Sequence, residues 1–253
     1  MYKIYNFEDN DDIKTIQELG PLKVIEYKRD LSVNPNTAMT AFFSAQMNVK
    51  KRQLVCDLSK TTGITLQSGA MQWMVGNANA TTGVKGVGDL FGKAIRGKVT
   101  GESAIKPEYK GTGKIITEPT YKHLILMDAE KWNGSVVLQD GHFLACESSL
   151  QHKTVMRNNI SSAVAGGEGL FNLCLNGTGK FCIESECPME ELIIIELEND
   201  VIKIDGNMAI AWSQTLNFTV ERSGKSLIGS AASGEGLVNV YRGTGKVLLM
   251  PVK

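Results

Sequence analysis

The chain lacks most of the patterns that reveal enzymes and metal proteins. Its 253 residues include three histidines and no His-x-His pair, which argues against a cupin-type metal centre. Five cysteines are scattered without a Cys-x-x-Cys pair, so they predict reduced and mostly buried thiols rather than disulfides or zinc ligands. Neither G-x-S-x-G nor H-E-x-x-H occurs. We therefore expect no catalytic residues, no metal and no cofactor.

Net charge and long apolar runs are missing as well. Lys+Arg and Asp+Glu both total 27, and this balance counts against a dedicated nucleic-acid binder. The longest apolar runs, HLILM and LIII, are strand-sized and far short of the ~18 residues of a membrane span. The opening MYKIYNFEDNDD lacks the basic-then-apolar order of a signal peptide. The expectation is a soluble cytoplasmic protein.

What the sequence does contain is a threefold internal repeat. The tetrapeptide GTGK begins at Gly111, Gly177 and Gly243, which are 66 residues apart. An apolar stretch interrupted by Ser-Gly or Asp-Gly precedes each copy, in ITLQSGAMQWM, VVLQDGHFLAC and IKIDGNMAIAW, and this pattern predicts a hairpin. A short aliphatic run, QLVCDL, HLILMD or LIIIEL, opens each unit and predicts a buried strand.

These landmarks divide the chain into three tandem β units and an N-terminal appendage. The units are residues 47–120, 121–188 and 189–253, and the appendage is residues 1–46. Within the appendage, FEDNDDIKTIQEL predicts a short helix, LKVIEY a strand and SVNPNTA a loop. A second short helix is predicted near residues 89–95. The sequence therefore predicts an all-β fold with a small additional segment.

The GTGK copies do not fit a phosphate-binding loop. Such a loop needs an earlier glycine, a Ser or Thr after the lysine, and a following helix, and none of these is present. Two glycines around a threonine instead favour a tight hairpin corner. The predicted turn glycines are Gly111, Gly113, Gly177, Gly179, Gly243 and Gly245. The lysines that follow, Lys114, Lys180 and Lys246, point to solvent or form an anion-binding ring in a multimer.

Two further groups of charged residues have alternative interpretations. Glu102, Glu168 and Glu235 follow a glycine in each unit and are either buried acceptors for turn N–H groups or catalytic carboxylates, the first being favoured. The basic run Lys50, Lys51 and Arg52 lies near Phe42 and Phe43 in the sequence. It is either the solvated rim of a strand or a contact for RNA or an anionic membrane.

The segments RQLVCDL and LQSGAMQWMVG and the repeated GEGL…GTGK resemble the bacterial members of a known family, the altered-inheritance-of-mitochondria protein twenty-four family. The resemblance runs from about Arg52 to the C-terminus, and the first unit departs from it with GESA in place of GEGL. It implies three domains similar to the tryptophan RNA-binding attenuation protein, of β-sandwich or double-stranded β-helix topology. It further implies a homotrimer whose nine units form a ring of approximate nine-fold symmetry.

Two functional hypotheses remain open from the sequence. The first is a non-enzymatic oligomeric β-ring that acts as a scaffold or interaction platform, as the fungal relative's link to mitochondrial inner-membrane organisation also suggests. The second is a module that binds a small ligand or RNA at the junctions between units or on a rim of lysines. The tryptophan- and RNA-binding residues of the attenuation protein have no matching motif here, and a fold alone does not transfer function.

Overall fold

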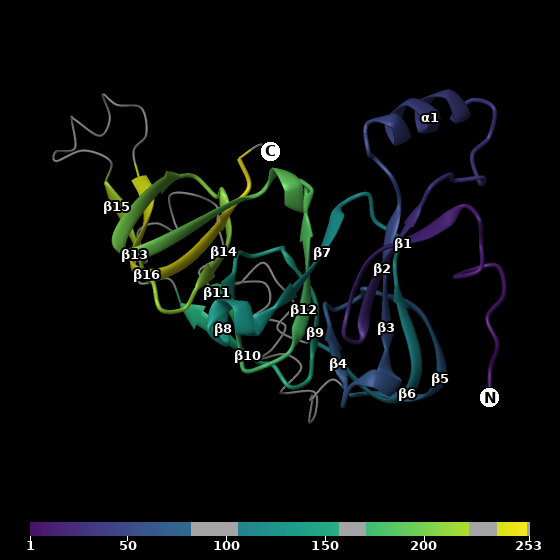
Figure 1. Ribbon diagram of the computed structural model, residues 1–253, viewed down its shortest axis with the longest axis horizontal. Coiled ribbons are helices and arrows are strands. Elements are labelled where there is room, and N and C mark those ends of the chain that lie inside the picture. Colours follow the sequence, from purple (N-terminus) through teal and green to yellow (C-terminus); the bar gives the residue numbers. More distant parts are fainter. Residues whose placement is uncertain (82–105, 157–170, 223–236, 252–253) are drawn as a thin grey trace, which may run out of the picture.

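The computed structural model describes residues 1–81, 106–156, 171–222 and 237–251, whose regular structure is mostly β-strand (Figure 1). The strands are β1 (Ile13–Leu19), β2 (Leu22–Tyr27), β3 (Arg52–Asp57), β4 (Ile64–Leu66), β5 (Met71–Thr81), β6 (Glu108–Thr117), β7 (His123–Asp128), β8 (Ser135–Leu138), β9 (Phe143–Glu147), β10 (Gln151–Met156), β11 (Phe171–Asn176), β12 (Lys180–Ser185), β13 (Ile193–Asp205), β14 (Ala209–Ser213), β15 (Asn217–Arg222) and β16 (Leu237–Leu249). The helices are α1 (Ala38–Gln46) and the short 3₁₀ turns η1 (Leu58–Lys60), η2 (Ala129–Trp132) and η3 (Met189–Glu191). The prediction of a mostly β protein is confirmed.

The strands form two antiparallel sheets. The first has the order β1-β2-β3-β6-β4-β9-β12-β7, with β5 paired to β6, and the second has the order β10-β11-β8-β14-β16-β13, with β15 paired to β16. The predicted buried strands at 53–58 and 123–128 are confirmed, because most side chains of β3 and β7 are buried. The third prediction, at 192–197, is confirmed as a strand, but its burial is largely wrong, because Ile193 and Ile194 at the start of β13 are 46% and 48% exposed. β13 lies at the end of its sheet.

One pairing arrangement occurs around each GTGK segment. β6 has β5 on one side and β3 and β4 on the other. The consecutive strands β11 and β12 have β10 and β9 on one side and β8 and β7 on the other. β16 has β15 and β14 on one side and β13 on the other. That these three arrangements are copies of one unit, with the boundaries given above, stays a prediction.

The GTGK segments themselves do not reverse the chain, so the predicted hairpin corners are wrong. Two of them lie inside the continuous strands β6 and β16, and the third connects β11 in the second sheet to β12 in the first. Their glycines allow a neighbouring strand to approach closely. A Cβ atom built on Gly113 would lie 2.0 Å from the carbonyl oxygen of Val75, and the φ angle of Gly113 is +136°. The glycines are therefore needed for bent, closely packed strands.

The predicted Ser-Gly and Asp-Gly hairpins are also wrong. Gly69, Gly141 and Gly206 do adopt positive φ angles, as glycines in turns often do. The strands that these turns connect are not paired with each other, however. β8 and β9 belong to different sheets, while β13 and β14 lie on opposite sides of β16. These turns therefore connect strands that are not neighbours in a sheet, instead of forming β-hairpins.

The N-terminal residues extend the first sheet. The helix predicted over residues 7–19 is wrong, because residues 13–19 form β1, which pairs with β2; the strand predicted at 22–27 is confirmed as β2. β2 pairs in turn with β3, so β1 and β2 add two strands to the first sheet beside β3. Helix α1 stands above the ends of these strands (Figure 1). The helix predicted near 89–95 lies outside the described residues.

Candidate functional site

The three lysines of the GTGK segments each face a carboxylate. Lys180 lies opposite Asp128 in the pairing of β12 with β7, and the Nζ–Oδ2 distance is 2.6 Å. Lys246 lies opposite Glu196 and forms an ion pair of 2.8 Å. Lys114 lies opposite Asp57 in the pairing of β6 with β3, and it forms an ion pair of 2.5 Å with Glu8. The hydrogen bond from Lys180 is the main reason that the pKa of Asp128 is below its ordinary value.

These ion pairs weaken the interpretation of the lysines as an anion-binding ring. An incoming anion would have to displace a carboxylate from each lysine. Lys114 and Lys180 belong to the first sheet and Lys246 to the second. The candidate acids Glu102, Glu168 and Glu235 lie outside the described residues, so neither interpretation of them is tested.

Within the basic run at 50–52, only the lysines are accessible. Arg52 was expected at a surface and is instead 1% exposed, because its guanidinium is enclosed by polar groups. Its Nη2 atom lies 2.8 Å from Oε2 of Glu26, and it donates further hydrogen bonds to the carbonyl oxygens of Asn48, Lys50 and Tyr121. Arg52 thus connects β2, β3 and the segment after α1 inside the protein, and its guanidinium is not accessible to a ligand.

The same cluster holds the two neighbouring lysines. Lys50 lies 3.7 Å from Glu26, and Lys51 donates to Asp30 at 2.5 Å. Burial by itself would raise the pKa of Glu26, but the hydrogen bonds and positive charges of Lys14 and Arg52 outweigh it and hold the pKa below its ordinary value. The basic run is therefore largely neutralised by carboxylates of its own chain.

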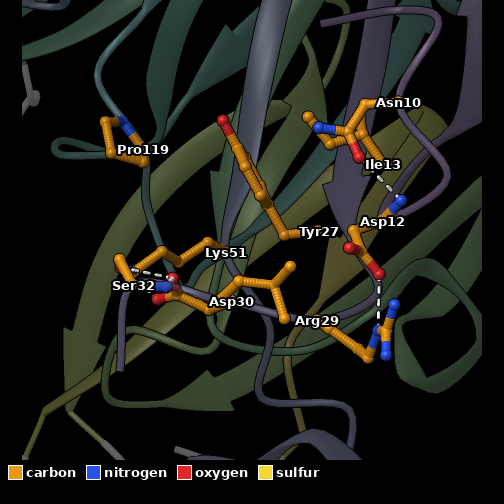
Figure 2. Close-up of a pocket in the computed structure, with 10 residues that line it drawn as sticks. Asn10, Asp12, Ile13, Tyr27, Arg29, Asp30, Ser32, Lys51 and Pro119 are labelled. Atoms are coloured by element: carbon orange, nitrogen blue, oxygen red, sulfur yellow. Dashed lines mark hydrogen bonds and ion pairs between the residues drawn. The ribbon is translucent and has the colours of Figure 1, made fainter. Parts of the chain in front are cut away.

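A cleft of about 330 Å³ lies beside this cluster (Figure 2). Figure 2 shows Arg29 with Asp12 on one side of the cleft and Lys51 with Asp30 on the other, with the ring of Tyr27 in the centre. The hydroxyl of Tyr27 donates to Gln53 at 2.7 Å, and burial raises the pKa of this tyrosine. Because the charged side chains that line the cleft are paired with one another, a charged ligand would have to compete with these ion pairs.

The chemically reactive side chains are buried or dispersed. All five cysteines are buried, as predicted, and burial raises the pKa of Cys146 to about 12, which keeps its thiol protonated and unreactive. Among the described residues, no three His, Cys, Asp or Glu side chains are grouped so that they would hold a metal ion. Burial also lowers the pKa values of His123 and His152.

Helix α1 presents a different kind of surface, which the sequence did not indicate. None of its residues is buried, and its outer side chains are strongly exposed: Met39 72%, Phe42 61% and Phe43 62%. Phe42 and Phe43 stack edge to face at 5.5 Å. A second cleft of about 580 Å³ begins at the end of this helix, between Met47 and Tyr121. Neither α1 nor any other helix of the described residues has the length and apolarity to cross a membrane.

The open edges of the sheets form a second candidate surface. Within the chain, β4 pairs with β9 and β8 pairs with β14. These two pairings join the strands around the first GTGK segment to those around the second, and the second to the third. β5 pairs only with β6, and β13 pairs only with β16, among the strands of the described residues. Sheet edges of this kind are available for strand addition.

Fold and surface together define a mostly β protein with open sheet edges and an exposed apolar helix. The model of the family described as mitochondrial biogenesis AIM24 matches residues 43–252, and the chain belongs to this family. The family resemblance inferred from the sequence is thereby confirmed, whereas the likeness to the attenuation protein stays a prediction.

Two streptococcal proteins are similar to the chain. An uncharacterized protein of Streptococcus pyogenes serotype M6 is 30% identical over 200 residues, which cover 76% of this chain and 78% of that protein. The crystal structure of protein SPYM3_0169 from Streptococcus pyogenes is similar with a TM-score of 0.60 and 26% identity. That match covers 82% of this chain and 90% of the other.

Proposed function

We propose that this chain is a non-enzymatic assembly protein, a closed β-ring of three copies that acts as a scaffold or interaction platform. The observation that carries the proposal is the repeated contact between β4 and β9 and between β8 and β14. Each contact is an antiparallel strand pairing that would continue onto a further copy if the open edges of β13 and β5 met.

The register of the two internal contacts supports this extension. Thr65 of β4 faces Cys146 of β9, and Val137 of β8 faces Trp212 of β14. Thr65 and Val137 also face residues 108 and 174 on their central strands, and Lys203 of β13 faces residue 240, again 66 positions further. Lys203 is therefore the residue of β13 that corresponds to Thr65 and Val137.

The same comparison identifies the matching residue on the other edge. Cys146 faces residue 181 and Trp212 faces residue 247, while Met74 of β5 faces residue 115. Each of these three strand pairs also contains a β-bulge near this position. These shared irregularities support three tandem units, since bulges are specific features of a strand pair. In the proposed assembly, Lys203 of one copy pairs with Met74 of the next.

Such a contact joins two different surfaces, so it generates either a closed ring or an open filament. Ring closure by three copies is the arrangement that the family resemblance implies. The alternative hypothesis, binding of RNA or a small anionic ligand by the lysines, is less well supported because Lys114, Lys180 and Lys246 are all paired with carboxylates.

Cysteine trapping tests the proposed register. In antiparallel strands, opposed Cα atoms are about 4.5–5.5 Å apart, which is within the range of a disulfide bond. The variant Met74→Cys/Lys203→Cys should form covalent dimers and trimers on mild oxidation, because the five native thiols are buried and do not compete. The control Gln72→Cys/Lys203→Cys is out of register and should crosslink at least fivefold less. Only monomers in the first variant, or equal crosslinking in both, would contradict the proposal.

A further inference from the structure

Helix α1 needs a partner that the described part of its own chain does not provide. Its nine residues include no buried side chain, and isolated helices shorter than ~12–15 residues are marginal in water. The apolar exposure extends past the helix on both sides, with Leu31 70% and Met47 79% exposed. Exposed apolar surface on this scale commonly marks an interaction site.

The charges around the helix do not favour a membrane as this partner. Residues 31–49 contain no charged side chain at all. The flanking Lys50 and Lys51 are paired with Glu26 and Asp30. Binding of an interfacial helix to anionic lipid relies on a basic polar face or adjacent free cations, and this helix has neither.

A second copy of the chain does offer a complementary surface. On β13, the exposed aliphatic residues Ile193, Ile194 and Val201 have exposed fractions of 46%, 48% and 43%. β13 runs from the middle of the molecule to the end of the long axis that lies opposite α1 (Figure 1). Head-to-tail association therefore brings the α1 end of one copy against the β13 end of the next, and covers two apolar surfaces at once.

The area that a stable interface must bury also favours a second copy of the chain as the partner of α1. Pairing of a few residues along a strand edge buries far less than the ~800 Å² per partner of a standard stable interface. Phe42 and Phe43, each about 60% exposed, would add roughly 100 Å² each if they were covered. We propose that α1 is an arm that covers the apolar β13 end of the next copy, and this inference rests on the head-to-tail assembly proposed above.

Replacement of the two aromatic side chains tests the arm. The variant Phe42→Ser/Phe43→Ser should raise the concentration at which the assembly half-dissociates at least tenfold, as followed by light scattering during dilution. The control Tyr5→Ser removes an aromatic side chain that is 70% exposed and lies outside the arm, and should change this concentration less than twofold. Unchanged dissociation of the double variant would overturn the arm while leaving the ring intact. A monomeric wild type at all concentrations would overturn both proposals.

Two additional measurements keep the test decisive. Hydrogen exchange of the amides of residues 38–46 in the wild-type protein should be protected in the assembly and lose that protection on dilution. Equal exchange at both concentrations would overturn the inference even if the double variant fails to fold. Sedimentation with vesicles of phosphatidylcholine and phosphatidylglycerol distinguishes the remaining partner: wild-type binding that the double variant loses, with assembly unchanged, would assign the helix to a membrane instead.

Discussion

The guanidinium of Arg52 and the carboxylate of Glu26 form an ion pair that is almost fully buried, with side chains 1% and 4% exposed and an Nη2–Oε2 distance of 2.8 Å. This pair ties β2, whose residues precede the family match, to β3 within it. The segment outside the matched region is thereby fixed to the sheet by a buried charge pair as well as by backbone pairing.

Loss of the arginine should destabilise the fold strongly. Arg52→Met leaves Glu26 buried beside weaker partners, and an uncompensated buried charge of this kind costs about 3–5 kcal/mol. Lys14→Met is the matched control, because this lysine lies 3.2 Å from Glu26 but is 45% exposed, and its loss should cost below ~1 kcal/mol. Urea unfolding at one protein concentration measures both values. Similar costs for the two variants would contradict a structural role for the buried pair.

The same pair predicts a dependence of stability on acid pH. The pKa of Glu26 is lower in the folded protein than the ordinary 4.5, so its unfolded form binds a proton more readily. Its contribution to stability is therefore present above pH 4.5 and is lost as the pH falls through the folded pKa. The difference in unfolding free energy between wild type and Glu26→Gln should narrow below pH 4.5. A difference that stays constant from pH 6 to about pH 3 would refute this assignment.

Gly113 should tolerate no side chain. Gly113→Ala places a Cβ atom 2.0 Å from a carbonyl oxygen of β5 in addition to its unfavourable φ angle, and should cost more than about 3 kcal/mol. Gly141 has a φ angle of +82° but nothing within 4 Å of an added Cβ, so Gly141→Ala isolates the backbone term at about 1 kcal/mol. Thermal or urea unfolding distinguishes the two. Equal costs would mean that β5 and β6 do not approach closely at Gly113.

These glycines show what local sequence leaves undetermined. A pair of glycines around a threonine is compatible with a reversal and with a bent continuous strand, and only the neighbouring strand, distant in sequence, decides between them. In β6 that neighbour is β5, against which Gly113 packs. The threefold spacing of GTGK was visible in the sequence, whereas the path of the chain around it was not.

Two other differences have similar causes. Residues 13–19 form a strand because β2 pairs with them, although their local pattern suits a helix. Arg52 belongs to a run of three basic residues, and its burial depends on Glu26, which the run itself does not reveal. Helix α1 has no acidic residue in its first turn and no side-chain cap, so the usual signals of a helix start are absent. The aliphatic strands β3 and β7 were predictable because burial dominates their composition.

The cysteines should be inert in the folded protein. All five are buried, and burial raises the pKa values of Cys56, Cys146 and Cys182. A thiol reagent such as dithionitrobenzoate should therefore modify none of them within minutes at pH 8, and all of them after denaturation. Rapid modification of even one thiol in the native protein would show an accessible site that the described fold does not contain.

The central claim is that the open edges of β5 and β13 join copies of this chain into a closed ring. The most direct test is the mass of the unmodified protein, measured by light scattering after size exclusion from about 1 to 100 µM. The account predicts one species with the mass of three chains that does not grow with concentration. A monomer across this range, or a mass that rises continuously as filaments form, would contradict it.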